Sequence, residues 1–307
     1  MSERHPSGSF SDVLYGVAAY SLWGLIPLYF KVVAQVSPVE VLAHRVLWSF
    51  VVLAVLASLL GRWGDVWKDL RNRKIVLLLG LNSLLMAANW LTFIYSVLTD
   101  QVLQSSLGYF IGPLIIVLLG ALFLRERLRP AQRVSLGMAV VGVLVFTVAM
   151  GAMPGIALIL ALTGAFHGLI RKLTPVDGFV SLTIETLLIV PLSVVFLSYL
   201  AVTAKNSGNS AALLGLLMLS GPVTTVPFLC FGRAVRRLRL STMGFLQYLL
   251  PSLQFLLAVA VFHESFSTAQ LVSFACIWTA IGIYTVDSYR AIRQGQLPPI
   301  EPLAIDP

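Results

Sequence analysis

Charged residues are scarce in this 307-residue chain. Asp, Glu, Lys and Arg make up 11% of it, whereas a soluble domain has roughly 25%. Hydrophobic residues make up 58%, and nearly all charges sit in short clusters between long apolar runs. This composition excludes a water-soluble fold, and the net charge of +8 is better explained by membrane topology than by nucleic-acid binding. We predict an all-α integral membrane protein whose surroundings are the lipid bilayer.

Cysteine and enzyme motifs are also nearly absent. Cys230 and Cys276 lie inside apolar runs without a CxxC pattern, so we expect free thiols packed as small hydrophobes. The sequence contains no GxxxxGK[ST] loop for ATP hydrolysis and no HExxH pattern for a metal. No nucleophile, base or metal ligands cluster at one depth. We therefore expect no catalytic residue, no cofactor and no metal site.

Ten apolar runs are long enough, at about 20 residues each, to cross the hydrocarbon core. They span 13–33, 39–60, 75–97, 102–123, 132–150, 154–171, 179–200, 211–231, 241–262 and 269–288. Helices are required because lipid cannot satisfy free backbone groups. The first run is followed by Lys31 and bulky residues rather than by a cleavage site, so we expect an uncleaved first span.

Basic residues in short loops set the orientation of such a protein. With a cytoplasmic N-terminus, the 21 Lys and Arg residues lie in cytoplasmic segments except Lys31, Lys205 and Arg45. The opposite orientation would reverse this bias. We therefore predict cytoplasmic tails at 1–12 and 289–307.

One stretch occurs twice in the chain. GPLIIVLLGALFLRERLRPAQ (112–132) returns 138 positions later as LPSLQFLLAVAVFHESFSTAQ (250–270). Under this offset Pro113 matches Pro251, Glu126 matches Glu264 and Gln132 matches Gln270. Such a period predicts two homologous halves, 13–150 and 154–288. Each half has five spans, an odd number, so the second half enters the membrane opposite to the first. Inverted repeats are typical of secondary transporters, although channels and scaffolds also arise by duplication.

Five runs resemble the RarD-type branch of the EamA family, in the drug/metabolite transporter superfamily. They are AHRVLWSF (43–50), ANWLTFIYSV (88–97), SLGYFIGPLIIVLLGALFLRERL (106–128), VTTVPFLCF (223–231) and RLRLSTMGFLQYLLPSLQFLLAV (237–259). The resemblance implies a bacterial inner-membrane protein of ten helices in two EamA repeats. It also implies an association with chloramphenicol sensitivity, with the transported substrate generally unassigned. Gly112 stands where related sequences tend to have asparagine, so no polar contact carries over to that position.

Arg45 lies about six residues inside the second span. A charge at that depth is costly and normally faces a bundle interior or an aqueous cavity. The alternatives are that Arg45 snorkels to the outer interface or bonds a neighbouring helix. We interpret it as a substrate-binding candidate.

Glu185 is the only acidic residue well inside a span, and it lies about six residues into the seventh run. Each of Arg45 and Glu185 is about 9 Å from its own membrane face at 1.5 Å per residue, and the faces are opposite. About 12 Å of depth then separates them in a 30 Å core, so no direct pair is expected. We place them at opposite ends of one central cavity. Burial away from a cation would let Glu185 bind a proton, and a structural carboxylate is the alternative.

The third span carries a polar and aromatic stripe at three- and four-residue spacing. It consists of Asn82, Met86, Asn89, Trp90 and Phe93. This spacing places the stripe on one helix face, where it serves either helix packing or cavity lining. We favour Asn89 and Trp90 as substrate contacts.

In the fourth span Gly108 and Gly112 form a GxxxG pair, which predicts close packing inside the monomer or, alternatively, a homodimer. Tyr109 lies beside this pair, and the matched region of the second half holds Gln247 and Tyr248. The matched prolines predict either broken helices or kinks. Glu126 and Glu264 are expected to help start the helices that follow them.

The residues that we expect to bind a small-molecule substrate are Arg45, Asn89, Trp90, Tyr109, Glu185, Gln247 and Tyr248, with Glu185 as the proton-coupling candidate. We interpret the chain as a secondary transporter that exports a small organic metabolite or drug-like molecule by alternating access. A passive channel and a scaffold or lipid-handling protein are the alternatives. A passive channel would need a ring of pore-lining groups, which two pseudo-symmetric halves do not readily supply.

Overall fold

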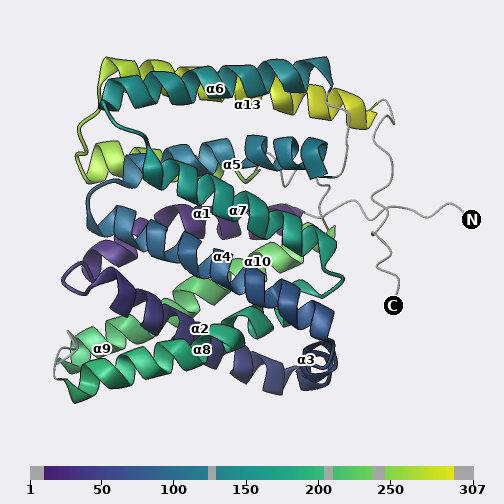
Figure 1. Ribbon diagram of the computed structural model, residues 1–307, viewed down its shortest axis with the longest axis vertical. Helices are drawn as coiled ribbons and strands as arrows, with labels where there is room; N and C mark the ends of the chain where they lie inside the picture. The colour runs from purple at the N-terminus through teal and green to yellow at the C-terminus, as the bar shows by residue number, and fades with distance from the viewer. Residues whose placement is uncertain (1–9, 124–128, 204–209, 238–245, 294–307) are drawn as a thin grey trace, which may run out of the picture.

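The structure is a computed structural model, and it describes residues 10–123, 129–203, 210–237 and 246–293 (Figure 1). Every regular element in these ranges is helical. The elements are α1 (Phe10–Val32), α2 (Pro38–Leu59), α3 (Trp63–Leu70), α4 (Arg73–Leu98), α5 (Val102–Phe123), α6 (Pro130–Met150), α7 (Gly155–Leu173), α8 (Gly178–Val202), α9 (Ala211–Met218), α10 (Ser220–Arg237), α12 (Leu249–Leu256), η1 (Leu257–Val261) and α13 (Thr268–Arg293). The prediction of a helical membrane protein is confirmed.

Seven helical segments in the described ranges are long and apolar enough to cross a membrane. They are Phe10–Val32, Pro38–Leu59, Arg73–Leu98, Pro130–Ala149, Gly178–Val202, Ala211–Ala234 and Thr268–Asp287. Three further apolar segments are shorter, namely Val102–Ile115, Gly155–Arg171 and Leu249–Val261. The connector after the second predicted span contains the amphipathic helix α3, which the apolar pattern did not predict.

The helices form a layered bundle (Figure 1). Helices α6 and α13 lie side by side at one edge of the view, and α2 and α8 pack together toward the other. Between them α7 packs against both α4 and α5, while α1 packs against both α10 and α12. Thus α7 and α1 link the elements that lie between the two edges.

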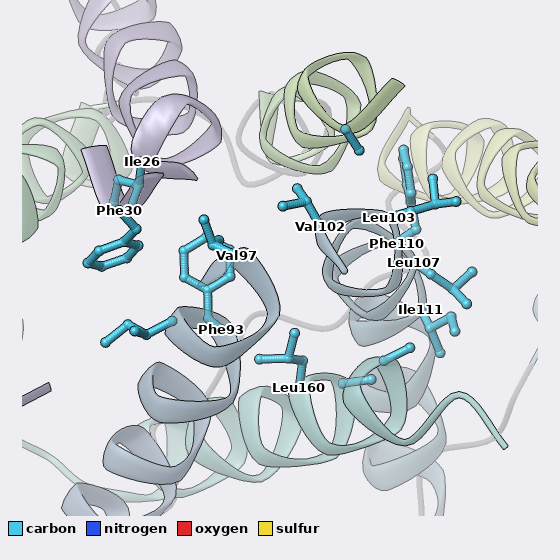
Figure 2. Packing of buried hydrophobic residues seen from close by; sticks show 14 of the residues in the cluster. Ile26, Phe30, Phe93, Val97, Val102, Leu103, Leu107, Phe110, Ile111 and Leu160 are labelled. Atoms are coloured by element: carbon cyan, nitrogen blue, oxygen red, sulfur yellow. The ribbon is translucent and has the colours of Figure 1, made fainter. Parts of the chain in front are cut away.

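The largest apolar cluster fills the space between α1, α4, α5 and α7 (Figure 2). Phe30, Phe93 and Phe110 are each at most 4% exposed. The rings of Phe30 and Phe93 are 5.9 Å apart, and Phe93 is 5.8 Å from Tyr109 in a second edge-on contact. Such edge-to-face pairs are a favourable aromatic geometry. This cluster packs against one residue of the predicted site, because Tyr109 contacts Phe93.

Glycines allow close approach at several helix crossings. A Cβ added at Gly108 would lie 2.7 Å from the carbonyl oxygen of Ala157, so α5 and α7 meet backbone to backbone. Gly142 has the same role where α6 meets Ile277 of α13, and Gly221 has it where α10 meets α2. The GxxxG pair therefore acts through Gly108 inside the monomer, whereas Gly112 has nothing within 4 Å of such a Cβ.

Gln132 and Gln270, which the internal repeat matches, each form a capping hydrogen bond at the start of a helix. Oε1 of Gln132 accepts a hydrogen bond from the Arg129 amide at 2.9 Å, at the start of α6. Oε1 of Gln270 accepts one from the Ser267 amide at 2.7 Å, at the start of α13. In each case a residue at the third helical position reaches back to the residue that begins the helix, as in a capping box. The matched glutamines therefore mark the start of the same helix in each half.

Glu264 has a different role from the one predicted for it. Its carboxylate accepts hydrogen bonds from the amides of Val102 and Leu103, at 2.6 and 2.8 Å. It therefore caps α5, in the other half of the chain, rather than the following helix, which begins with Ser267. The prediction was wrong because the loop after η1 lies over the start of α5, a contact that the sequence pattern does not encode. The matched residue Glu126 lies outside the described residues.

Replacing Glu264 with alanine is expected to cost about 1 kcal/mol, the usual value of an N-terminal cap. Burial raises the pKa of Glu264 above its usual value, although the two amide hydrogen bonds oppose this shift. A carboxyl whose pKa is raised in the folded state stabilises the fold at low pH, and this contribution is lost as pH rises through that pKa. The melting temperature of wild type relative to Glu264→Gln should therefore fall as the pH rises above about 4, the ordinary pKa of a glutamate. If the difference in melting temperature between wild type and Glu264→Gln did not change with pH, a raised pKa of Glu264 in the folded state would be contradicted.

Candidate functional site

Arg45 is buried where α2, α4 and α10 meet. Its side chain is 4% exposed, and its Nε donates a hydrogen bond of 2.9 Å to Oγ1 of Thr224 on α10. Its guanidinium lies over the ring of Trp90, 4.1 Å from the centroid, and 5.5 Å from the centroid of Phe30. Cation–π contacts of this kind are stronger when they are desolvated. The structure therefore brings the predicted residues Arg45 and Trp90 together and adds Thr224 and Phe30.

Two tyrosines complete the surroundings of Arg45. Tyr29 of α1 and Tyr109 of α5 both lie near its guanidinium. The hydroxyl of Tyr29 donates to the carbonyl of Leu216 at 2.9 Å, and that of Tyr109 lies 3.5 Å from Oδ1 of Asn89. Aromatic side chains from α1, α4 and α5 therefore surround the Arg45 guanidinium.

Asn89 connects this ring to the second half. Its Nδ2 donates to the carbonyl of Leu160 at 3.1 Å and to Oγ1 of Thr163 at 2.9 Å, both on α7. The amide that we predicted as a substrate contact is therefore occupied by helix packing on its nitrogen side. Its oxygen lies 3.5 Å from the hydroxyl of Tyr109, so the contacts of Asn89 on both sides of its amide are contacts with neighbouring helices.

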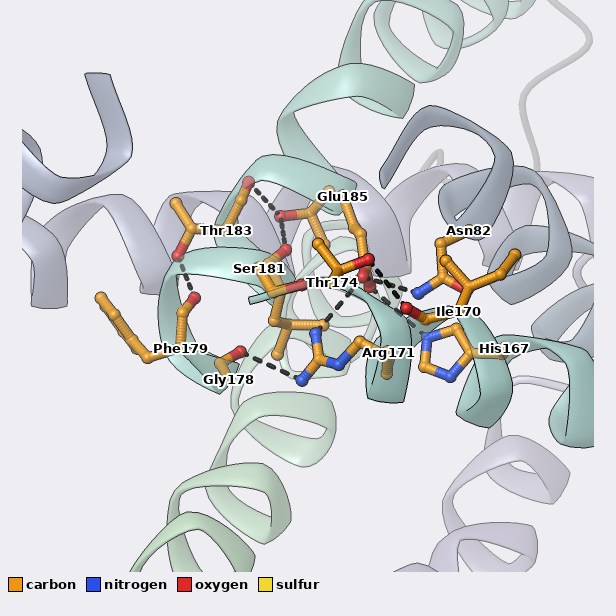
Figure 3. Close-up of polar contacts among 12 residues, drawn as sticks. Asn82, His167, Ile170, Arg171, Thr174, Gly178, Phe179, Ser181, Thr183 and Glu185 are labelled. Carbon is orange, nitrogen blue, oxygen red and sulfur yellow. Dashed lines mark hydrogen bonds and ion pairs between the residues drawn. The ribbon is translucent and has the colours of Figure 1, made fainter. Parts of the chain in front are cut away.

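Glu185 lies in a separate polar cluster formed by α4, α7 and α8 (Figure 3). Its side chain is 0% exposed. Oε1 accepts hydrogen bonds from Asn82 Nδ2 at 2.8 Å, Ser181 Oγ at 3.1 Å and Arg171 Nη1 at 3.3 Å. Oε2 lies 3.5 Å from His167 Nε2. The cluster holds one carboxylate between a guanidinium and an imidazole.

The premise that Glu185 is buried away from a cation is wrong, because Arg171 and His167 both reach it. Arg171 had been counted among the cytoplasmic loop charges, but its guanidinium turns back toward α8. His167 is not among the residues that the sequence predicts for the site. A signal for both was present: they lie four residues apart on one helix, so they share a face. Arg45 and Glu185 have different partners, and among the described residues no ion pair joins the two.

Gln247 and Tyr248 lie apart from this arrangement. Tyr248 precedes the first turn of α12, and its hydroxyl lies near the side chains of Tyr284 and Thr285 of α13. Among the described residues, no hydrogen bond or ring contact joins either of the two to Arg45. A hollow of about 490 Å³ lies nearby, between the start of α6 and the end of α13, and is lined by Ala131, Thr279, Gly282, Ile283, Val286, Asp287 and Arg290. None of the predicted site residues lines this hollow.

Within the described part of the chain, no group of three or more His, Cys, Asp and Glu side chains is arranged to hold a metal. The two cysteines, Cys230 and Cys276, are free. The polar contacts of the two clusters are hydrogen bonds and ion pairs, made by Arg45 in one and by Glu185 in the other.

The sequence is similar to that of known membrane proteins. A model of the EamA-like transporter family matches residues 11–148. The chain is 44% identical over 281 residues to an uncharacterized transporter of Vibrio cholerae, covering 91% of this chain and 93% of that protein. It is 41% identical over 284 residues to Protein RarD of Escherichia coli, covering 92% and 96%. It is 37% identical over 281 residues to the uncharacterized transporter YojE of Bacillus subtilis, covering 91% and 94%.

The fold is also similar to a solved one. A protein crystal structure superposes with a TM-score of 0.58 at 20% sequence identity, covering 90% of this chain and 97% of that chain. At this identity the likeness concerns the arrangement of the helices alone. It extends over both halves of the chain, beyond the range that the family model matches.

Proposed function

Because this chain belongs to the RarD-type branch of the EamA-like transporter family, we propose that it is a secondary transporter that exports a small organic molecule by alternating access. The family makes the chain a membrane transporter of the drug/metabolite transporter superfamily rather than an enzyme. One relative, from Pseudomonas aeruginosa, is called a chloramphenicol-sensitive protein RarD and is 30% identical over 290 residues. A bacterial inner membrane is the location that this kinship supports.

We further propose ten membrane helices arranged as two inverted repeats. The seven long apolar segments and the three shorter ones supply this number within the described ranges. The packing supports a two-fold relation between halves, because α1 contacts α10 and α12 as α7 contacts α4 and α5. A two-fold pseudo-axis would then relate the two members of each of three packed pairs: α2 with α8, α5 with α12, and α6 with α13. The shared capping role of Gln132 and Gln270 supports the same relation.

Cytoplasmic termini are part of this proposal. The end of α13 and the short helix α3 lie at the same end of the bundle (Figure 1). Asp12 near the start of α1 pairs with Arg233 near the end of α10, 3.7 Å apart. Positively charged segments gather at the cytoplasmic face of membrane proteins, and α3 is flanked by such a segment.

The observation that carries the proposed site is the burial of Arg45 between the two halves. Its hydrogen bond to Thr224 joins α2 to α10, and the bond from Asn82 to Glu185 joins α4 to α8. Under a five-helix repeat these two helix pairs are equivalent. Each half then contributes one intramembrane charge to a contact with the other half. Sites at the interface of inverted repeats are typical of secondary transporters.

The burial also favours alternating access over a permanently open pore. Arg45 is 4% exposed and Glu185 0% exposed, so a solute can reach either one only when helices move. Contacts between α2 and α10 on one side, and between α4 and α8 on the other, would have to open in turn.

We propose that Glu185 couples transport to protons together with His167. Histidine is the side chain that normally changes charge near neutral pH. A proton on His167 Nε2 would point at Oε2 of Glu185, which has no hydrogen-bond partner of its own among the described residues. Arg171, Asn82 and Ser181 hold the other oxygen in place. A proton can therefore move between His167 and Oε2 of Glu185 while the hydrogen bonds to Oε1 stay in place.

A ligand screen tests the proposed function. We expect at least one compound of a metabolite and drug library to raise the melting temperature of the purified chain in a dose-dependent way, at pH 6 or pH 8. The shift should be lost in Arg45→Ala, because the proposed site includes Arg45. Stabilisation by lipids alone would favour the scaffold or lipid-handling alternative. A ligand unaffected by Arg45→Ala would move the site elsewhere.

A further inference from the structure

Arg45 is a buried cation without a counter-ion. In the part of the chain that the structure describes, no carboxylate forms an ion pair with it. Its hydrogen-bond partner is the neutral hydroxyl of Thr224, and the aromatic side chains around it, Trp90, Phe30, Tyr29 and Tyr109, carry no negative charge at neutral pH. An intramembrane cation normally pairs with another group or marks a substrate pathway. By contrast, Glu185 already has both Arg171 and His167.

The guanidinium is also incompletely hydrogen-bonded. Nη1 of Arg45 is buried and has no acceptor among the described residues. Leaving a charged donor unsatisfied costs more than leaving a neutral one, so its retention calls for an explanation. Ser49, one helical turn further along α2, is 0% exposed, and its Oγ has no partner either. Residues four apart share a helix face, so the two unsatisfied groups lie on the same side of α2.

Resting on the proposed transport function, we propose that Arg45 and Ser49 bind the oxyanion group of the substrate, which is a small organic acid. A carboxylate or phosphate oxygen supplies the acceptor that Nη1 lacks, and charge-assisted bonds of this type are the strong ones. The Ser49 hydroxyl supplies a second donor. Since Arg45 is the single charge of this cluster, a monoanion neutralises it. Trp90 fixes the plane of the guanidinium, so the open Nη1 has a defined direction.

This assignment separates two roles that Arg45 could have. A structural Arg would be held by its protein contacts and would lower the stability of the fold when removed. A substrate-binding Arg leaves an uncompensated buried charge in the free protein, and a neutral group at that position avoids the cost of burying an unpaired charge. We therefore expect ligand-free Arg45→Gln to melt at the same temperature as wild type or higher.

The test uses the full chain in a non-ionic detergent at pH 7, with a library of small organic acids, each paired with its primary amide. Carboxylates and methyl phosphate are both included, because either could supply the oxyanion. We expect at least one acid to bind while its amide does not. Arg45→Gln should abolish this binding, Arg45→Lys should weaken it roughly 10- to 100-fold, and Ser49→Ala should weaken it about 10-fold. Arg62→Gln, which removes a charge outside the membrane, should leave it unchanged.

Several results would overturn the proposal. Equal binding of an acid and its amide, or undiminished binding to Arg45→Gln, would remove the oxyanion role. A large loss of ligand-free stability in Arg45→Gln would make the residue structural. Stabilisation by phosphatidylglycerol vesicles with no response to any free acid would assign the oxyanion to lipid. If neutral compounds bind and acids do not, only this inference fails; if no compound of any charge binds, the proposed transport function fails with it.

Discussion

Replacing Glu185 with glutamine is expected to abolish pH-driven transport in proteoliposomes. Glutamine keeps the size of the side chain and an acceptor for Asn82, which donates to Oε1 at 2.8 Å. It cannot take up a proton from His167, 3.5 Å away, and it leaves Arg171 without a counter-ion. Removing one partner of a buried ion pair costs about 3–5 kcal/mol. The melting temperature of Glu185→Gln should therefore fall as well.

A double-mutant cycle separates these two effects. Arg171→Met in the Glu185→Gln background should recover most of the lost stability, because the unpaired charge is gone, while pH-driven transport should stay absent. Asp65→Asn, which changes an acidic residue of the exposed α3 pair with Arg62, serves as the matched control and should transport normally. Unchanged pH-driven transport in Glu185→Gln would remove the proton role from this cluster.

Replacing Gly221 with alanine is expected to destabilise the contact between α10 and α2. The added Cβ would lie 2.5 Å from the carbonyl oxygen of Trp48, a backbone atom that cannot turn away. Overpacking of this kind typically costs about 1–3 kcal/mol. Transport should fall too, because Thr224 lies three residues further along α10 and holds Arg45.

Gly215→Ala is the control for this substitution. An added Cβ at Gly215 meets nothing within 4 Å, and alanine is the better helix former by about 1 kcal/mol. Thermal unfolding of the two variants in the same detergent should therefore give shifts of opposite sign. Equal stability of Gly221→Ala and Gly215→Ala would show that the two helices can separate without cost.

The apolar spans were predictable because lipid imposes a length and a composition on any crossing helix. Short elements were not: α3 is amphipathic, α9 ends at Met218 inside one predicted span, and η1 interrupts the helical ladder after Leu256. These features depend on neighbouring helices rather than on local hydrophobicity. The predicted edges of the long spans lie within a few residues of the observed ones, as for Pro38–Leu59.

The candidate site was predictable where a single residue broke the apolar pattern. Arg45 and Glu185 were found by their charge, and Trp90 by its helical spacing to Asn82 and Met86. The partners of Glu185 were missed because Arg171 lies near a helix end, where a basic residue ordinarily belongs to the loop. Tyr248 was grouped with the site through the repeat, yet it packs toward α13. Sequence indicates which residues are costly in lipid, whereas their partners depend on tertiary packing.

Counterflow in proteoliposomes tests the central claim, an alternating-access carrier whose site contains Arg45, most directly. Vesicles are loaded with a compound that stabilises the protein, and uptake of the labelled compound from dilute external solution is followed. The account predicts a transient accumulation above equilibrium for wild type and Arg62→Gln, and none for Arg45→Gln. Non-saturable uptake without accumulation in wild type, or full accumulation in Arg45→Gln, would contradict it.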